Sequence, residues 1–411
     1  MKPSNVEVLD PRERRQDERR QDERRQVPLL QRVPAPAGTT WHRAWPGGRP
    51  GEQDRPLVLE GRDADGHVVA ATARPHLRSG VLTGAHVQVL REDHRLPALG
   101  TARAEGAVLV GHRAGKRAVL RSGAAGAPQS FLKVARPAAT RTALARLHAV
   151  DAALGGHPGR PALVEVTGAA EGLLRLRPAM GCDLSALLAA GEDPAALARC
   201  HAAGRATAVA GGALAAVTAS PAAAGLPVHD AGAEAAVLRR WAGDARDFGV
   251  LASAQAARLN ALVTAVGDAL LALPPVPPVL SHRDLHEAQV LVRFPQPGCS
   301  DGVGALADPG AAVVTFLDVD TAARADPCLD AANLLAHLDL ALVRGAAPAA
   351  VAAVRAGLRE GWAACGHPLL DSGPQRLALW RTAARLRLVA VHAFRGSVSD
   401  LAHWIGCHAL R

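Results

Sequence analysis

Aromatic residues are scarce in this chain. Phe, Trp and Tyr together make up 3% of its 411 residues, and there is no tyrosine. A core of this size must therefore be filled by leucine, valine and alanine. The scarcity also argues against single-stranded nucleic acid as a partner, because such binding relies on aromatic stacking. The net charge of +9 would attract a polyanion, but the basic residues are spread along the chain, so we do not expect nucleic-acid binding.

The chain also lacks the cysteine patterns of a metal site or disulfide framework. Its six cysteines form no C-x-x-C pair, so we expect reduced, buried thiols in a cytoplasmic protein. No apolar segment follows the charged N-terminus, which argues against a secretion signal. The stretch 206–228 is rich in Ala and Gly and is broken by Pro221, so we expect a packed helix and loop there, not a membrane span.

Two segments in the C-terminal half carry the strongest functional pattern. The first, 282–289, reads HRDLHEAQ and precedes a strand-like run; the second, 313–320, is apolar and ends in two carboxylates. Asp284 on a tight loop could orient a substrate hydroxyl, and Gln289 and Asp318 could hold Mg²⁺. Asp284 and Asp318 are 34 residues apart, which a β-hairpin with an enlarged loop would fold together. The alternative for an HRD tripeptide alone is a surface salt bridge.

These segments resemble the aminoglycoside phosphotransferase and choline kinase superfamily of small-molecule kinases. The family pattern H-x-D-x-x-x-x-N is followed there by a strand pair, a metal-binding Asp and a D-P-x-x-D-L-A-like segment, which here reads DPCLDAANLL over 326–335. Segment 174–184 resembles the hinge between lobes, and 357–362 resembles a helix that usually carries a Phe-Leu-x-Gly-Tyr run. The resemblance implies an α+β, two-lobed protein-kinase-like fold, with a β-rich N-lobe and a larger, mainly helical C-lobe.

The resemblance also implies roles for individual residues. Asp284 would be catalytic and would position the acceptor hydroxyl, and His282 would brace its loop by hydrogen bonds. Asp318 and Gln289 would bind Mg²⁺, and Lys133 would contact the α- and β-phosphates of ATP. An edge-strand lysine that faces water is the alternative for Lys133.

Two departures from the family pattern leave a second function open. Gln289 stands where the family has Asn, and the helix after Lys133 lacks the usual Glu, because Asp151 is the only acid between Thr140 and Leu154. Both departures support a catalytically inactive kinase-like protein that binds nucleotides or regulates a partner. The carboxylates of Asp284 and Asp318 instead support an enzyme.

We expect three regions along the chain. Residues 1–35 form a disordered charged tail with a repeated QDERR, which could bind a protein partner. Residues 36–178 form an N-terminal β-rich nucleotide-binding lobe. Residues 179–411 form a C-terminal helical catalytic lobe, in which Asp330 caps a helix and ties it to the catalytic loop.

The predicted reaction is an ATP- and Mg²⁺-dependent transfer of the γ-phosphoryl group to a hydroxyl of a small molecule. A protein kinase is disfavoured, because the D-F-G tripeptide 247–249 precedes the catalytic loop instead of following it. Residues 321–411 contain ten arginines and six acidic residues, which argues against a polycationic aminoglycoside. The composition favours a neutral or anionic acceptor, such as a sugar or a sugar phosphate.

Overall fold

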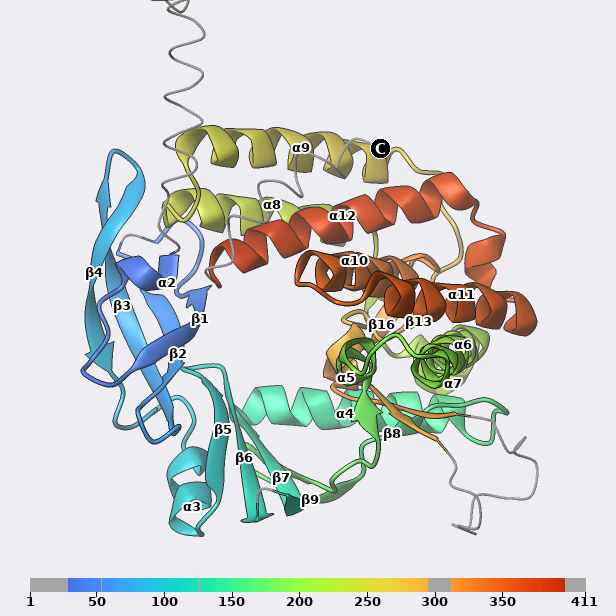
Figure 1. The fold of residues 1–411 in the computed structure, drawn as a ribbon, viewed down its shortest axis with the longest axis horizontal. Coiled ribbons are helices and arrows are strands. Elements are labelled where there is room, and N and C mark those ends of the chain that lie inside the picture. The colour runs from blue at the N-terminus through green and yellow to red at the C-terminus, as the bar shows by residue number, and fades with distance from the viewer. Residues whose placement is uncertain (1–28, 53, 125, 295–311, 396–411) are drawn as a thin grey trace, which may run out of the picture.

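The computed structural model describes residues 29–52, 54–124, 126–294 and 312–395. The sheets of the N-terminal part lie on one side of the molecule, and the helices of the C-terminal part lie on the other (Figure 1). This is the two-lobed α+β arrangement that the sequence predicts. In the described part of the chain, none of the helices combines the length and hydropathy that crossing a bilayer requires.

An antiparallel sheet of four strands forms the first N-terminal layer. Its order is β1-β2-β3-β4, and the bounds are β1 (Thr40–Pro46), β2 (Leu57–Arg62), β3 (Val68–Arg78) and β4 (Val81–Val89). Strands β2 and β3 form a hairpin around the Asp65-Gly66 turn and pair antiparallel from Leu57↔Ala73 to Arg62↔Val68. Short helix α2 (Leu29–Arg32) packs against this sheet and buries Leu29, so the tail expected over 1–35 overlaps an ordered segment. Residues 1–28 lie outside the described ranges.

A second sheet of five strands follows, in the order β5-β6-β7-β10-β9. The bounds are β5 (Val108–Arg113), β6 (Arg117–Ala124), β7 (Ala127–Ala135), β9 (Val166–Ala170) and β10 (Leu173–Leu176), with α3 (Ala98–Ala104) before it. Strands β5 and β6 form a hairpin. The short strand β8 (Ala162–Leu163), which comes before β9 in the chain, belongs to another sheet.

Two small sheets position the C-terminal loops. One has the order β11-β14-β15-β8 and the other β12-β16-β13. The expected hairpin is β14 (Val290–Arg293) paired antiparallel with β15 (Val313–Phe316), and its connecting residues 295–311 lie outside the described ranges. The remaining strands are β11 (Cys182–Asp183), β12 (Val228–His229), β13 (Val279–Ser281) and β16 (Ala323–Ala325).

Helices make up most of the C-terminal lobe. Helix α4 (Pro137–Leu154) precedes this lobe. The helices of the lobe are α5 (Leu184–Ala189), α6 (Pro194–Ala216), α7 (Pro221–Ala224), α8 (Ala231–Asp247), α9 (Ser253–Leu271), α10 (Leu329–Val343), α11 (Pro348–Cys365) and α12 (Pro374–Ala393), with short 3₁₀ turns η1 (Glu287–Gln289), η2 (Val319–Thr321) and η3 (Pro368–Leu370). The D-F-G tripeptide is the C-terminal end of α8, where Phe248 caps the helix and Gly249 has a positive φ. It is therefore a helix-to-loop turn, as expected.

Leucine, alanine and valine dominate the core, as the composition predicts. Alanine and glycine also let two helices approach closely: a Cβ atom on Gly357 of α11 would lie 2.0 Å from the carbonyl oxygen of His201 in α6. The main core continues from the first sheet into the C-terminal helices, since Leu82 of β4 and Phe248 belong to the same cluster. Leu82 also donates its N–H to the carbonyl of Gly249 at 3.1 Å.

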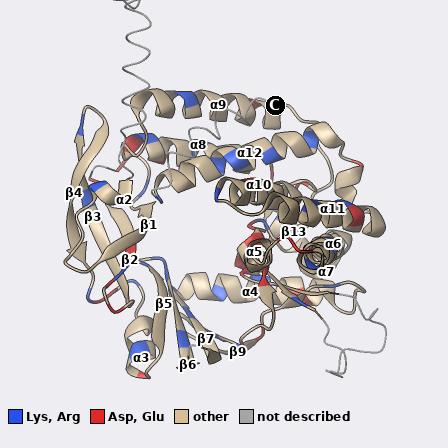
Figure 2. Ribbon diagram, viewed as in Figure 1, with Lys and Arg blue, Asp and Glu red and all other residues tan. Residues whose placement is uncertain are grey.

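Basic residues are distributed over both lobes. Figure 2 shows Lys and Arg on the sheets and on the helices, interspersed with acidic positions. This agrees with the even spread of charge along the sequence.

Candidate active site

The loop after β13 is held by backbone hydrogen bonds to helix α10. The carboxylate of Asp330, in the first turn of that helix, accepts the N–H groups of His282 (2.6 Å) and Arg283 (2.7 Å). Asn333, one turn later, donates to the carbonyl of Arg283 at 3.0 Å. Arg283 has a φ of 73°, which is strained for a residue with a side chain. The hydrogen bonds from Asp330 and Asn333 hold the loop in this strained conformation. The predicted tie between Asp330 and the loop is present, but Asp330 does not cap the helix, because it lies inside the first turn and Cys328 is the N-cap residue. The loop presents Asp284 at the surface of a cavity.

His282 is buried and engaged at both ring nitrogens. Its Nε2 lies 2.6 Å from the carbonyl oxygen of Leu317, to which it can only donate, and its Nδ1 accepts from the N–H of Asp284 at 3.4 Å. The edge of the ring also packs on Phe316, with ring centroids 5.8 Å apart. These contacts connect the catalytic loop to the strand that precedes Asp318, which fits the bracing role expected for His282.

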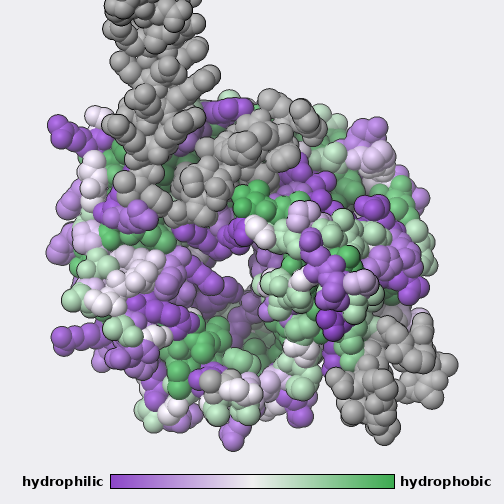
Figure 3. Space-filling view, in the orientation of Figure 1, coloured by the Kyte–Doolittle hydropathy of each residue, from purple (hydrophilic) through white to green (hydrophobic). Residues whose placement is uncertain are grey.

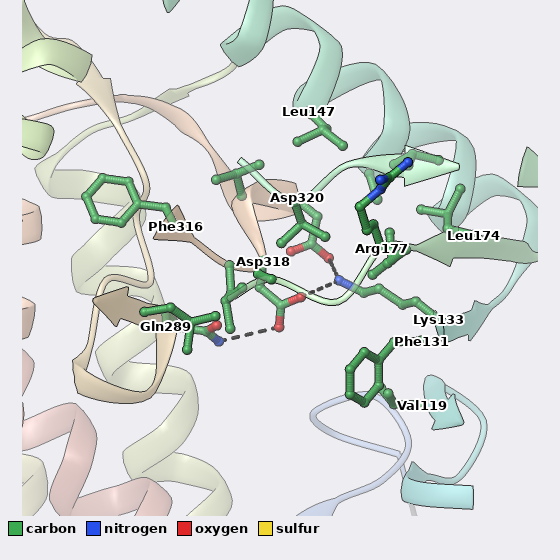
Figure 4. A pocket seen from close by; sticks show the side chains of 18 of the residues that line it. Val119, Phe131, Lys133, Leu147, Leu174, Arg177, Gln289, Phe316, Asp318 and Asp320 are labelled. Carbon is green, nitrogen blue, oxygen red and sulfur yellow. Dashed lines mark hydrogen bonds and ion pairs between the residues drawn. The ribbon is translucent and has the colours of Figure 1, made fainter. Parts of the chain in front are cut away.

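Lys133 and two carboxylates form an ion-pair cluster between the lobes. The Lys133 Nζ donates to Asp318 Oδ1 at 2.8 Å and to Asp320 Oδ2 at 2.9 Å (Figure 4). Gln289 points at the same carboxylate from η1, with its Nε2 3.4 Å from Asp318 Oδ2. Arg117 of β6 approaches that oxygen to 3.8 Å. The fold thus joins three residues that are distant in sequence but were predicted to share one site, namely Lys133, Gln289 and Asp318.

Burial and mutual charge shift the pKa values of Lys133 and Asp318 in this cluster. Burial alone would lower the pKa of the Lys133 ammonium, but the carboxylates of Asp318 and Asp320 outweigh it and raise that pKa. Burial would raise the pKa of Asp318, but the charge and hydrogen bond of Lys133 lower it to about 2. Lys133 is 9% exposed and belongs to a central strand of its sheet, so it is not a water-facing edge lysine.

Helix α4 supplies a different residue in place of the expected glutamate. Arg146 of this helix donates to the main-chain carbonyl of Asp320 at 2.6 Å. Lys133 is instead paired with the carboxylates that follow β15, so its charge is compensated without a glutamate from α4. The missing Glu therefore removes one anchor of Lys133 but leaves no uncompensated buried ammonium.

A largely apolar cavity of about 420 Å³ lies against this cluster. Figure 4 shows the side chains of Leu147 and Leu174 on one side and of Val119 and Phe131 on another, with Lys133 pointing toward the carboxylates. Aliphatic and aromatic walls with a few polar groups at one end suit a flat heterocycle joined to a phosphate chain. The wall is formed by residues from both lobes and from the hinge: Val119, Phe131, Ala143, Leu147, Val164, Val166, Leu174, Leu176, Arg177, Ala179, Gly181, Leu291, Phe316, Leu317 and Val319.

The oxygen atoms beside Lys133 suit a hard divalent cation. The two carboxylates of Asp318 and Asp320 lie within contact of one ammonium, and the amide of Gln289 faces Asp318 Oδ2. The amide carries an oxygen as well as a nitrogen, and a half-turn of the amide group directs that oxygen to the same point. Carboxylate and amide oxygens are ligands that Mg²⁺ accepts, so the donor set fits the predicted metal.

A second cavity, of about 480 Å³, contains Asp284. Val119 lines both cavities, so they adjoin at strand β6. Figure 3 shows a hollow in the middle of the visible face with largely hydrophilic residues at its rim, between the positions of β1, β5 and α12 in Figure 1. These three elements all contribute to the wall of the second cavity. The apolar cavity and the carboxylate of Asp284 therefore lie on two sides of one junction.

A buried polar network behind the catalytic loop was not foreseen from the sequence. Glu234 of α8 is 1% exposed and interacts with His229 (2.8 Å) and Arg387 of α12 (3.1 Å). Arg387 also donates to Asn333, which holds the catalytic loop. Burial would raise the pKa of Glu234, but the charge of Arg387 and the hydrogen bond of His229 lower it. No local motif marks these residues, because they become neighbours only when α8, α10 and α12 pack together.

His286 is occupied by structural contacts. Its Nδ1 accepts from the N–H of Ala288 at 3.2 Å, and its ring stacks on His337 with centroids 4.7 Å apart. Burial and the neighbouring His337 lower its pKa to about 4, so the ring is neutral at physiological pH. These contacts leave His286 a structural role in the loop.

Comparisons with known proteins identify the fold. No protein-family model matches the chain, and no curated protein sequence matches it. Among solved structures, the complex of amicoumacin kinase hAmiN with AMP-PNP, Ca²⁺ and Ami is similar with a TM-score of 0.51 and 12% identity, over 78% of this chain and 92% of that chain. The GDP and kanamycin complex of APH(2″)-IIia gives 0.47 and 15% over 73% and 90%. Macrolide 2′-phosphotransferase MphH from Brachybacterium faecium gives 0.37 and 21% over 72% and 96%.

The first of these similarities extends over nearly all of the kinase and most of this chain. At 12% identity the similarity shows the fold alone. The protein therefore has the fold of the aminoglycoside phosphotransferase-like small-molecule kinases.

Proposed function

We propose that this protein is an ATP- and Mg²⁺-dependent phosphotransferase that moves the γ-phosphoryl group to a hydroxyl of a small molecule. The observation that carries the proposal is the pair of adjoining cavities. One is apolar and ends at Lys133 and Asp318, and the other contains Asp284. A phosphoryl group at their junction would face a nucleophile on one side and its leaving group on the other.

The apolar cavity would hold the adenine ring between the aliphatic and aromatic side chains of the two lobes. Its polar end would receive the phosphates, where Lys133 and Arg117 supply positive charge. Asp318, Gln289 and Asp320 would hold Mg²⁺. When bound, Mg²⁺ neutralises charge on the phosphate oxygens.

Asp284 would orient the acceptor hydroxyl and take its proton as transfer proceeds. The hydroxyl oxygen forms a bond to the γ-phosphorus, and the bond from that phosphorus to the β–γ bridging oxygen breaks. The products are a phosphate ester and ADP, and the proton remains on the carboxylate of Asp284 until it passes to solvent. His282, Asp330 and Asn333 would keep the loop in position through their contacts with Leu317 and the backbone of 282–283.

A thermal-shift experiment with ATP tests the proposal, with and without Mg²⁺, on the wild type and on Asp318→Ala. We expect Mg²⁺-dependent stabilisation by ATP in the wild type and its loss in Asp318→Ala. Asp284→Asn should still bind Mg²⁺ and ATP, because Asp284 does not line the nucleotide cavity.

The second candidate function is a nucleotide-binding or regulatory protein without catalysis, which the absent glutamate and Gln289 favour. It predicts ATP binding with no phosphoryl transfer in the wild type. ATP binding that is indifferent to Mg²⁺ and to Asp318→Ala would also favour it over the kinase.

A further inference from the structure

The cavity that contains Asp284 is strongly cationic. Seven arginines and three acidic residues line it: Arg43, Arg113, Arg117, Arg240, Arg283, Arg387, Arg395, Glu60, Glu234 and Asp284. Side chains that line a cavity at this density of one charge sign repel one another unless a counter-charge enters. The excess of arginine over acidic residues therefore favours an anionic ligand in this cavity.

Some of these charges are already neutralised inside the protein. Arg387 is paired with Glu234, and Arg117 lies 3.8 Å from the Asp318 carboxylate at the nucleotide side. Glu60 accepts the N–H of His112 at 2.5 Å and lies 3.8 Å from Arg43. These pairs account for two of the three acidic residues, and the third is Asp284 itself.

Four of the seven arginines have no carboxylate ion-pair partner in the ranges that the structure describes: Arg283, which is next to Asp284 on the same loop, and Arg113, Arg240 and Arg395, which come from other elements. The guanidinium of Arg113 lies 5.2 Å from the centroid of the Trp45 ring, a contact that leaves its N–H groups directed elsewhere. Arg240 projects from α8 and is exposed to the cavity. Arg395 has its Nε buried with no hydrogen-bond partner among the described residues.

The electrostatics of these residues show that they act on one another. Burial and the charges of Arg117 and Arg240 lower the pKa of Arg113 to about 10. Burial and the charges of Arg43, Arg344 and Arg113 lower the pKa of Arg395 to about 10. Both groups stay protonated at neutral pH, so the repulsion persists and an anion in the cavity would relieve it.

The nucleotide does not account for this cluster. Its phosphates would meet Lys133 and Arg117 at the edge of the other cavity, and none of Arg113, Arg240 and Arg395 lines that cavity. The three arginines come from β5, α8 and the turn after α12, so they surround the space in front of Asp284 from three elements.

We propose that the acceptor is an anionic hydroxyl compound, a sugar or polyol that already carries a phosphate group, with this group bound by Arg113, Arg240 and Arg395. A guanidinium group can donate two parallel hydrogen bonds to two oxygens of a phosphate. We therefore propose a phosphate as the anionic group of the acceptor. The inference rests on the proposed kinase function. It names the acceptor class for that same site, and a polycationic aminoglycoside would be repelled from it.

Binding of inorganic phosphate is the first test, measured by calorimetry on protein saturated with Mg²⁺ and AMP-PNP. Saturation blocks the nucleotide site, so the phosphate signal reports the second cavity. We expect binding in the wild type and a loss of about ten- to a hundredfold in affinity in Arg240→Ala, the factor of one charge-assisted hydrogen bond. Arg239→Ala is the matched control, because Arg239 is the adjacent residue of α8 and pairs with Asp268 away from the cavity. No phosphate binding, or equal binding in both variants, overturns the proposal.

The second test separates the classes of acceptor. A small-molecule cell extract, freed of nucleotides, is divided by ion exchange into anionic, neutral and cationic fractions, and each is incubated with the protein and ATP labelled in the γ-phosphate. We expect label transfer with the anionic fraction only, absent in Asp284→Asn. Identification of the labelled products then shows whether the anionic group that the acceptor already carried is a phosphate ester or a carboxylate. Transfer with the neutral fraction, or with kanamycin, overturns the acceptor class and leaves the kinase function standing. Normal Mg²⁺·ATP binding without transfer in any fraction contradicts the kinase function, and the acceptor proposal falls with it.

Discussion

Gly357→Ala should destabilise the protein, because α11 and α6 meet there without room for a methyl group. The added Cβ would lie 2.0 Å from the His201 carbonyl oxygen and 2.8 Å from the Arg205 nitrogen, whereas real Cβ contacts stay above 3.0 Å. The obstacle is helix backbone, which cannot rotate away as a side chain can. The two helices must therefore separate by about 1 Å, which disturbs the packing along their whole contact.

The expected cost is about 1–3 kcal/mol, the usual range for overpacking a well-packed core. Replacing a helical glycine by alanine contributes about 0.5–1 kcal/mol in the opposite direction. Gly211→Ala in α6 isolates that second effect, because no atom lies within 4 Å of its added Cβ. We therefore expect Gly357→Ala to lower the free energy of unfolding and Gly211→Ala to raise it.

Urea unfolding at neutral pH, followed by circular dichroism, measures both variants. A displacement of α6 should also move β13, the strand before the loop that carries Asp284. Thr218, just beyond α6, accepts the N–H of Leu280 in β13 at 2.6 Å. Gly357→Ala should for that reason also lower phosphoryl transfer. Equal midpoints for the two variants would refute the argument from close approach.

Three further changes have defined outcomes. Lys133→Met should weaken ATP binding, which a nucleotide titration measures as a lower affinity. It also leaves the carboxylates of Asp318 and Asp320 without their shared cation, so urea unfolding should show a lower free energy of unfolding. Asp330→Ala should lower kcat by about 10²–10⁴ by releasing the loop that holds Asp284, with little change in ATP affinity; a comparable loss of ATP affinity would contradict this. The depressed pKa of Asp318, about 2, means that its ion pair with Lys133 stabilises the apo protein above about pH 4 and ceases to do so as the pH falls toward 2. Asp318→Asn should therefore differ most from the wild type in unfolding free energy at neutral pH, and the difference should shrink over that window.

The sequence predicts well those parts of the site that lie in one local pattern. The loop before β14 and the carboxylates after β15 are recognisable because a strand pair brings them together at a fixed spacing. The prediction for Lys133 came from the family resemblance, and the fold places its ammonium beside Asp318. The fold class was predicted from the family resemblance that these motifs carry.

Long-range packing accounts for what the sequence could not predict. The arginines in front of Asp284 come from segments as far apart as Arg43 and Arg395, and only the folded chain places them on one cavity. The excess of arginine after residue 320 indicated the sign of the charge but not its location. The sequence predicted a β-rich N-terminal lobe but not that the four strands of its first sheet share a core with the C-terminal helices.

The contact of the first sheet with α8 also changes how the two lobes can move. Arg55 pairs with Asp244 at 2.7 Å with both side chains buried, and Leu82 bonds to Gly249 nearby. The lobes therefore meet at this junction as well as at the Lys133–Asp318–Asp320 cluster and near Gly181. Opening the lobes like a clamp would break the buried ion pair of Arg55 and Asp244, so we expect the first sheet and α8 to stay together when substrates enter.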